Sequence, residues 1–241
     1  MILRVASHNV CHSGFDPENG QEMVDGAYRY GYPEEWIGKM RENWKRVYSG
    51  FSADIIGLQE YCRWFDLSHT EKTEDVVYRP FGYEINGNVP AGGMCLAVAS
   101  KLPLKYEEES TFEPVSPRHW QKFRADVGGR SVAVFNCHPS PKADRGPIRQ
   151  EEYRLLIEEF KKEEYFIAFG DYNARTADEF RIFEEAGYPM ANHGIPTVRV
   201  SGSTCDNIVV SPNVRIRNVQ VFDPGFSLSD HAVLYAELEI N

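Results

Sequence analysis

The sequence predicts an α/β domain in which two β-sheets pack face to face and helices cover their outer faces. Three observations predict this fold class. Short apolar segments with strand character occur in both halves of the chain, amphipathic helical segments lie between them, and Gly128-Gly129 separates two apolar runs as a hairpin turn would. The 241 residues contain no internal repeat, low-complexity segment or linker, so we expect a single domain over 1–241.

The strands are expected at short apolar or alternating segments that end at turn residues. They span 2–8, 53–58, 83–85, 92–100, 119–127, 130–138, 165–169, 207–210, 214–221 and 232–240. A long loop rich in Gly, Pro, Tyr and Asp is expected over 10–33, and loops of that length tend to be functional. The mixed stretch 61–80 predicts no particular element.

The helices are expected at segments whose apolar residues recur at helical spacing. The first covers 34–50 after Pro33, and the second covers 147–162. A short third helix is expected to begin near Thr176, which has capping-box spacing to Glu179. The aromatic residues of the first helix are expected to pack in the core rather than to bind a ligand.

Composition and charge exclude several classes of protein. There are 26 Lys and Arg against 36 Asp and Glu, so the net charge is −10, which disfavours a basic nucleic-acid coat protein. No apolar run approaches the ~20 residues of a membrane helix. The five cysteines form no CxxC pair, which disfavours a disulfide framework and a zinc knuckle. The N-terminus lacks the layout of a secretion signal, so a cytoplasmic location is expected, although a processed mature form would look the same.

Polar residues stand directly after several predicted strands. These are Asn9, Glu60, His138, Asp171 and Asn173. In sandwiched α/β architectures, sites collect at strand ends. If these strands are neighbours and share a direction, the five side chains converge on one rim.

Asp171 and Asn173 are separated by one residue, so in extended chain both face the same side while Tyr172 turns away. This spacing predicts a shared pocket. The alternative is a turn in which both side chains bond their own backbone.

Asp230 and His231 are adjacent, and neighbours in a regular strand point to opposite faces. Both reach one site only if the backbone bends, which the loop-forming stretch 224–229 permits. The alternative is a solvated loop tip. Asp206 stands at the start of an apolar run. It is a candidate site residue, and the alternative is that it only caps the start of a strand.

A cluster of Glu60, Asp171, Asp206 and Asp230 near two imidazoles would be repulsive. Such a pocket is stable only if some acids are protonated or a hard cation lies among them. Oxygen ligands without thiolates select Mg²⁺ or Mn²⁺ over zinc. The cluster would suit the hydrolysis of a phosphate ester.

Short motifs in a fixed order resemble the endonuclease/exonuclease/phosphatase superfamily, which includes deoxyribonuclease-like nucleases, exonuclease III-like repair enzymes, neutral sphingomyelinases, deadenylases and inositol polyphosphate phosphatases. The motifs are Ser7-His8-Asn9, Leu58-Gln59-Glu60, Gly92-Gly93-Met94 through Ser100-Lys101-Leu102-Pro103-Leu104, Asn136-Cys137-His138, Gly170-Asp171-Tyr172-Asn173, Cys205-Asp206-Asn207-Ile208 and Ser229-Asp230-His231. The resemblance covers nearly the whole chain. It implies a four-layer α-β-β-α sandwich of two mainly antiparallel sheets packed face to face with helices outside.

The resemblance also implies a metal site. Glu60 would be the principal ligand of Mg²⁺, with Asn9 and Asp230 in or near the metal shell and Mn²⁺ as a substitute ion. The metal would neutralise negative charge that develops on the phosphate.

The same resemblance implies catalytic roles for five residues. Asp171 would orient and deprotonate the attacking water, with Asn173 helping to place it. His231 would lie against the phosphate, kept cationic by Asp206, because an adjacent carboxylate raises the pKa of an imidazole. His138 would donate to a non-bridging oxygen.

These features predict a Mg²⁺-dependent hydrolase of phosphate esters, a phosphodiesterase or nuclease acting by in-line water attack, with DNA or RNA among its substrates. One alternative is a phosphatase or sphingomyelinase-type hydrolase of a small or lipid-derived phosphate ester. Another is an inactive scaffold with the same fold, although the intact set of acids, amides and histidines argues against it. No membrane span and no protein partner are predicted. Basic side chains near the hairpin and the histidine loop could meet phosphates or form a solvated surface: Arg118, His119, Lys122, Lys142, Arg145 and Arg149.

Overall fold

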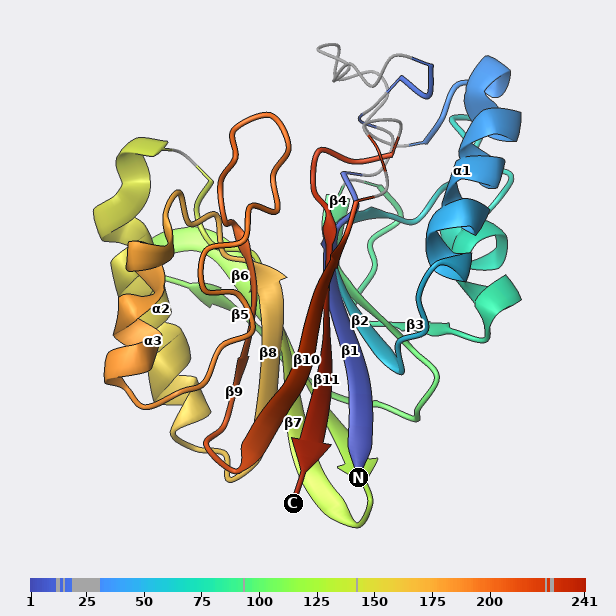
Figure 1. The fold of residues 1–241 in the computed structure, drawn as a ribbon. Coiled ribbons are helices and arrows are strands. Elements are labelled where there is room, and N and C mark those ends of the chain that lie inside the picture. The colour runs from blue at the N-terminus through green and yellow to red at the C-terminus, as the bar shows by residue number, and fades with distance from the viewer. Residues whose placement is uncertain are drawn as a thin grey trace.

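The computed structural model describes residues 1–11, 14, 16–18, 31–92, 94–141, 143–223, 225 and 228–241. Most of the loop expected over 10–33 therefore lies outside the described residues. Two β-sheets stand face to face, and the two chain ends lie side by side at one end of the molecule (Figure 1). The Met1 ammonium group donates to the Ile240 carbonyl oxygen there, at 3.2 Å.

The first sheet has six strands in the order β10-β11-β1-β2-β4-β3. The strands are β1 (Ile2–Asn9), β2 (Ile55–Cys62), β3 (Glu84–Asn86), β4 (Met94–Ser100), β10 (Val214–Phe222) and β11 (Val233–Ile240). Only β1 and β2 pair in parallel, with Asn9 opposite Gln59, and the other neighbours are antiparallel.

The second sheet has five strands in the order β5-β6-β7-β8-β9. The strands are β5 (Lys105–Phe112), β6 (Ser116–Val127), β7 (Arg130–Cys137), β8 (Phe166–Asp171) and β9 (Asp206–Val210). Here β7 and β8 are the parallel pair, with Cys137 opposite Gly170. The remaining pairs are antiparallel, and β9 places Asp206 opposite Asp171.

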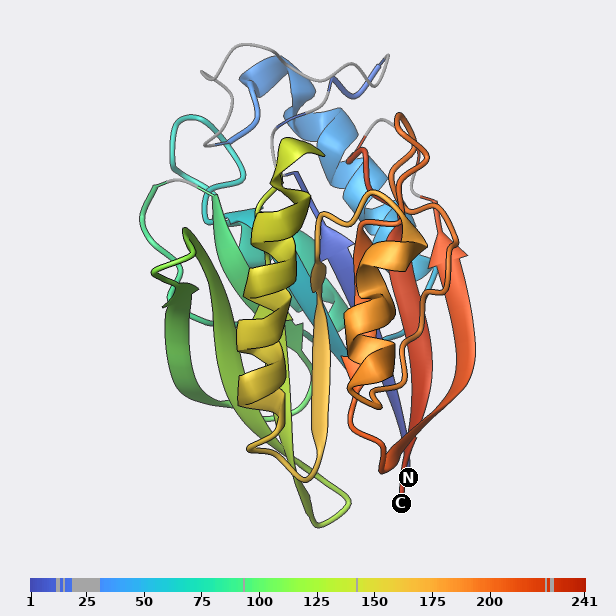
Figure 2. The ribbon, with the colours of Figure 1, turned by 90° about the vertical axis from the view of Figure 1, so that its left-hand side faces the viewer.

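Helices cover the outer face of each sheet. Helix α1 (Ile37–Ser49) lies on the first sheet (Figure 1), and α2 (Gly146–Phe160) and α3 (Arg181–Glu185) lie on the second (Figure 2). Short helical turns complete the chain at Glu34–Trp36, Glu74–Tyr78, Arg79–Phe81, Ala143–Arg145 and Ala177–Phe180. The architecture is the predicted α-β-β-α sandwich. Within the described parts of the chain, no helix has both the length and the apolar character needed to span a bilayer.

The buried apolar side chains form three layers, as four stacked layers of secondary structure require. Trp44 of α1 packs with Leu58 on the outer face of the first sheet. Val5 and Ile167 belong to the central layer between the two sheets. Phe160 of α2 lies in the third layer, beneath the helices of the second sheet. Trp44 and Tyr48 are thus core residues, as expected, and Trp36 packs against this layer partly buried.

Buried hydrogen bonds and a close packing contact connect the two sheets. The Gln59 amide donates to Oδ1 of Asn136 at 2.7 Å, and the Asn136 amide donates to the carbonyl oxygens of Leu58 and Ala97 at 3.0 and 2.8 Å. The Phe169 ring lies so close to Gly57 that a Cβ atom there would stand 1.9 Å from it. These contacts fix β2 of one sheet against β7 and β8 of the other.

Three local features differ from expectation. Strand β5 has the sequence KYEEESTF, and its charged, exposed residues hid an edge strand, which proteins often protect with charge. Strand β2 continues through Glu60 to Cys62 instead of ending before it. The Thr176 side chain makes no capping hydrogen bond. The Glu179 carboxylate instead accepts hydrogen bonds from the Arg175 backbone N–H and the Arg149 guanidinium.

Candidate active site

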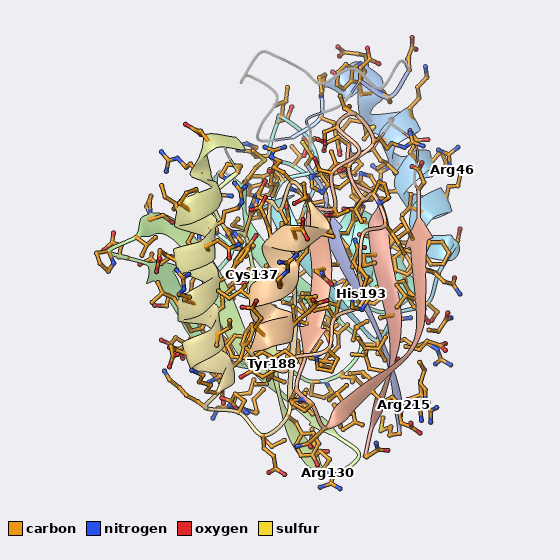
Figure 3. All side chains as sticks on the ribbon, turned by 60° about the vertical axis from the view of Figure 1, so that its left-hand side comes forward. Arg46, Arg130, Cys137, Tyr188, His193 and Arg215 are labelled. Carbon is orange, nitrogen blue, oxygen red and sulfur yellow. The ribbon has the colours of Figure 1, made fainter. Side chains whose placement is uncertain are left out.

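Strand direction brings the predicted site residues to one end of the sandwich. Strands β1 and β2 run parallel, and so do β7 and β8. Within each pair, the carboxyl ends of the two strands therefore lie at the same edge of the sheet. Strand β7 runs from Arg130 at the lower end of the molecule up to Cys137, and His138 follows it directly (Figure 3). Asp206 starts the antiparallel β9 opposite Asp171, so it reaches the same end.

Asp171 is the centre of the cluster. Its Oδ2 accepts a hydrogen bond from the Asn9 amide at 2.9 Å and lies 3.3 Å from Nε2 of His138 and 3.7 Å from Nε2 of His231. Burial alone would raise the pKa of Asp171, but the positive charge of His231 and the hydrogen bonds of His138 and Asn9 hold it well below the usual range. Asp171 is therefore a carboxylate at neutral pH, although it is 1% exposed.

His231 is held by a second buried carboxylate. Its Nδ1 lies 2.8 Å from Oδ2 of Asp206. Burial would lower the pKa of His231, but the charges of Asp206 and Asp171 raise it well above its ordinary value, so the imidazole is cationic at neutral pH. Its free ring nitrogen, Nε2, faces Asp171.

The backbone bend expected before β11 is present. The Ser229 hydroxyl donates to the Asn9 carbonyl oxygen at 2.7 Å and accepts the His231 backbone N–H at 3.1 Å. This link fastens the segment before β11 to the end of β1. Asp230 and His231 therefore both reach the cluster, and Asp230 Oδ1 lies 4.0 Å from Nε2 of His231.

Glu60 reaches the site through a β-bulge. The register of β2 against β4 shifts between Leu58 and Tyr61, and Glu60 itself has φ +56°, a conformation uncommon outside glycine. In a regular strand, Gln59 and Glu60 would face opposite sides of the sheet. With the bulge, Gln59 points between the sheets while Oε1 of Glu60 accepts from the Asn9 amide at 3.2 Å.

Asn173 forms the turn that was the alternative interpretation of its spacing. Its backbone N–H donates to Oδ1 of Asp171 at 2.8 Å, which is the expected turn, and its φ is +56°. Its side-chain amide donates to the Pro139 carbonyl oxygen at 3.0 Å. Asn173 therefore anchors Asp171 and the loop after β7, while Tyr172 turns into the core as predicted.

The donor set is compatible with a cation. Glu60 and Asp230 are the least buried acids of the cluster, with side chains 27% and 30% exposed. Burial and the negative charges of Glu60 and Asp171 raise the pKa of Asp230, against the effect of His231, so these acids repel one another. The ligand atoms of Asp171, Asp206 and His231 also lie within 4.8 Å of one another, a group that could hold a metal ion.

The Asn9 amide has a defined orientation. Its NH₂ group faces the carboxylates of Glu60 and Asp171, and its oxygen accepts the Cys11 backbone N–H at 3.0 Å. As oriented, Asn9 positions two acids. Its place in the metal shell stays a prediction.

A cavity of about 270 Å³ opens beside Glu60 and His138. Its other described lining residues are Met94, Cys95, Leu96, Arg118 and His119. Burial, together with the charges of Arg118 and His138, lowers the pKa of His119 to about 4, so this imidazole is neutral near pH 7. The sequence offered no signal for the apolar part of this lining, because Met94 and Leu96 lie in an ordinary buried strand pattern.

The basic residues near the site have separate positions. Arg118 lines the cavity and donates through Nε to the His138 carbonyl oxygen at 3.0 Å. Lys122 is paired with Glu163 at 2.6 Å, and Arg149 is buried against Glu179. Lys142 lies outside the described residues. Of Arg118, Lys122 and Arg149, only Arg118 lines the cavity, where it could meet a bound anion.

The layered fold and its cluster of acids and imidazoles define an α/β sandwich protein with a candidate active site at one end of its sheets. The sequence profile of the Endonuclease/Exonuclease/phosphatase family matches residues 33–231. The chain belongs to this family, whose members are phosphoesterases and nucleases.

Solved structures share the fold over nearly the whole chain. The D. rerio TDP2 structure with a single-strand DNA product is 14% identical, with 99% of each chain covered and a TM-score of 0.70. The human Nocturnin catalytic domain with bound sulfate is 16% identical, covering 100% of this chain and 95% of that one, with a TM-score of 0.67. ANGEL2, a 2′,3′-cyclic phosphatase in complex with adenosine-2′,3′-vanadate, is 14% identical, covering 99% and 95%, with a TM-score of 0.69. No curated protein matches the sequence.

Proposed function

We propose that this chain is a Mg²⁺-dependent phosphodiesterase, with a nuclease as the first candidate. One observation carries the proposal: the buried Asp171 carboxylate lies within 3.7 Å of two imidazoles, at the rim where Glu60 and Asp230 are partly exposed. Such a centre presents negative oxygens for a water molecule and a cation beside positive groups for a phosphate. Family membership supports the same chemistry.

The metal would be held by Glu60 and Asp230. Their oxygens suit a hard cation, and their mutual repulsion is what a cation would relieve. We do not assign the metal to Asp206 and His231, because their 2.8 Å contact is an ordinary hydrogen bond that needs no ion. In this proposal Asp206 keeps His231 protonated, and His231 contacts the phosphate. When bound, Mg²⁺ would supply charge neutralisation for the phosphate oxygens.

Asp171 orients the attacking water and takes its proton as the water oxygen bonds to phosphorus and the P–O bond to the leaving group breaks. The leaving oxygen takes up a proton from solvent. Because the pKa of Asp171 is low, it is a weak base, so its main contribution is to align the water. His231, cationic beside Asp206, and His138 would contact non-bridging oxygens as negative charge grows there.

The neighbouring cavity favours a diester over a monoester. Its volume of about 270 Å³ gives space for a second ester group next to His138, and Met94 and Leu96 line it with apolar surface. A nucleoside would fit this character, since its base is flat and uncharged. Two structural neighbours were solved with a DNA product and with adenosine-2′,3′-vanadate, which supports nucleic acids as the first substrates to test.

The test compares bis-p-nitrophenyl phosphate with p-nitrophenyl phosphate in Mg²⁺, Mn²⁺ and EDTA, followed by plasmid DNA, RNA and inositol phosphates in magnesium buffer. We expect turnover of the diester and of a nucleic acid that EDTA abolishes. Preference for the monoester would favour a phosphatase. An absence of turnover with every substrate, together with no metal-dependent rise in melting temperature, would favour a scaffold protein.

A further inference from the structure

Every backbone carbonyl of the segment 138–141 accepts a hydrogen bond from a side chain of another element. This segment, which we call the histidine loop, connects β7 to the turn before α2. The donors are Arg118 Nε to His138 O at 3.0 Å, Asn173 Nδ2 to Pro139 O at 3.0 Å, Arg149 Nη1 to Ser140 O at 3.3 Å and Arg175 Nη2 to Pro141 O at 2.6 Å. Four side chains from outside the loop therefore hold its backbone.

The two N–H groups of the histidine loop are also paired. Pro139 and Pro141 have none, which prevents a regular backbone hydrogen-bond ladder here. His138 donates its backbone N–H to the His119 carbonyl oxygen at 3.3 Å. Ser140 donates its backbone N–H to Oε2 of Glu152 at 2.9 Å and its hydroxyl to Oε1 at 2.7 Å. Side chains thus replace secondary structure in satisfying this buried backbone.

Two of these partners are buried charges on one helix. Glu152 is 0% exposed and Arg149 is 1% exposed, and both lie on α2. Burying a charge costs far more than burying an apolar side chain, and Tyr153, Leu156 and Phe160 already supply the apolar packing of α2. Helix packing alone therefore does not explain why α2 buries a carboxylate and a guanidinium under the histidine loop.

Both charges are fixed by further contacts, so they present a rigid surface to the loop. Glu152 also accepts a hydrogen bond from the Ser116 hydroxyl on β6. Arg149 is bidentate to Glu179, with Nε and Nη2 at 2.9 and 3.0 Å from its two oxygens. Bidentate guanidinium–carboxylate pairs combine strength with fixed geometry.

We propose that Arg149 and Glu152 are positioning residues that act through His138. By fixing Ser140, they hold the histidine loop in the conformation that places Nε2 of His138 3.3 Å from Asp171 and 3.9 Å from Glu60. The role in turnover rests on the proposed function, whereas the clamp on the loop does not. A shift of about 1 Å in a group that contacts the transition state can lower turnover by ~10²-fold.

The primary variants are Glu152→Ala and Arg149→Met, assayed on the best diester substrate in Mg²⁺. We expect kcat to fall by about 10- to 100-fold with a much smaller change in KM, because the β4 residues Met94, Cys95 and Leu96 of the cavity lining are not part of the histidine loop. Arg149→Lys should recover part of the loss, since an ammonium group can still donate to the Ser140 carbonyl oxygen. If Glu152→Ala fails to fold, Ser140→Ala removes the hydroxyl contact alone and should give a smaller loss of kcat in the same direction.

Leu156→Ala is the matched control. It removes a fully buried apolar side chain from the same helix and leaves every hydrogen bond of the histidine loop in place, so it should lower the melting temperature while kcat stays near the wild-type value. A loss of kcat in Leu156→Ala equal to that in Glu152→Ala would overturn the proposal, because general loosening of α2 would then suffice.

A double-mutant cycle with His138→Ala tests whether Glu152 acts through His138. We expect Glu152→Ala to cost much less in the His138→Ala background than in the wild type. Equal losses in both backgrounds would contradict the proposal.

Hydrogen exchange separates this inference from the proposed function. The Ser140 amide should exchange at least 10-fold faster in Glu152→Ala, while the β7 amides keep their protection. Faster exchange would support the clamp even in a protein without phosphodiesterase activity. Unchanged exchange at Ser140 would overturn it, whatever the enzyme assays show.

Discussion

Nδ1 of His231 lies 2.8 Å from Oδ2 of Asp206, and both side chains are buried. The carboxylate fixes the ring so that Nε2 faces Asp171, 3.7 Å away. It also raises the pKa of His231 and keeps the ring cationic. One buried contact therefore sets both the orientation and the charge of this imidazole.

Asp206→Asn should lower kcat and change the pH profile. A group whose pKa is raised in the folded protein keeps its proton up to that pKa, so the wild type should lose the His231 cation only at high pH. Without the carboxylate, the alkaline limb should move to lower pH, and kcat should fall by about 10²–10³-fold. A kcat–pH profile of both proteins measures this. An unshifted alkaline limb would contradict the assigned role.

Asp171→Asn should nearly abolish turnover while leaving the protein folded. The amide keeps the shape of the carboxylate but cannot take a proton or balance the charge of His231, so we expect a loss of at least about 10²-fold. Activity assays with circular dichroism spectra and melting curves check this. Full activity in the folded variant would rule out Asp171 as the group that aligns the water.

Glu60→Gln and Asp230→Asn should weaken metal binding. An ion that binds only the folded state raises the melting temperature as its concentration rises. We expect Mg²⁺ to stabilise the wild type and to stabilise either variant much less, because each loses an oxygen anion at the partly exposed rim. Thermal melts with Mg²⁺ and with EDTA measure the difference. Asp54→Asn, a change outside the cluster, serves as the control. Equal stabilisation of all four proteins would place the ion elsewhere.

The convergence of the site could be predicted because apolar strands end at polar residues. Asn9 and Asp171 are the last residues of such strands and His138 directly follows one, and strand direction brings them together. The bulge at Glu60 could not be read from Leu58-Gln59-Glu60, because a left-handed residue inside a strand has no local sequence signal here.

The buried contacts of α2 and the edge strand β5 could not be predicted from the sequence either. Glu152 and Arg149 look like ordinary polar positions of an amphipathic helix, and only the fold places them beneath the histidine loop. Strand β5 was missed because its charged residues suit an edge and carry no apolar alternation. The sequence predicts where chain segments end far better than which buried partners they meet.

Gly57→Ala should destabilise the fold through a collision between the sheets. A Cβ atom at Gly57 would lie 1.9 Å from the Phe169 ring, so the two sheets would have to separate locally. Overpacking of this kind costs about 1–3 kcal/mol. Gly38→Ala is the control, because Gly38 lies in α1 with nothing within 4 Å of the new Cβ atom, and alanine there should stabilise the helix by roughly 0.5–1 kcal/mol. Urea unfolding of both variants measures the two effects, and a neutral Gly57→Ala would show that the sheets are less closely packed than the contact implies.

Glu163→Gln should destabilise the protein at neutral pH but not in acid. Oε1 of Glu163 lies 2.6 Å from Nζ of Lys122, and Oε2 lies 2.6 Å from Nη1 of Arg124. The Glu163 side chain is 10% exposed. Burial would raise the pKa of Glu163, but the hydrogen bonds and charges of these two cations lower it below the usual 4.5. A carboxyl group with a lowered pKa stabilises the fold above its unfolded-state pKa, and that contribution disappears as the pH falls through the folded-state value.

The expected loss for Glu163→Gln is about 1 kcal/mol at pH 7, because the network still touches solvent. The difference between variant and wild type should narrow as the pH falls from 7 toward 3.5, which urea unfolding across that range measures. Glu158→Gln supplies the control, because Glu158 pairs with Lys161 and both side chains are more than half exposed, so its loss should change the free energy of unfolding little. A Glu163→Gln difference that stayed constant with pH would mean that the side chain stabilises the protein by packing and not by its charge.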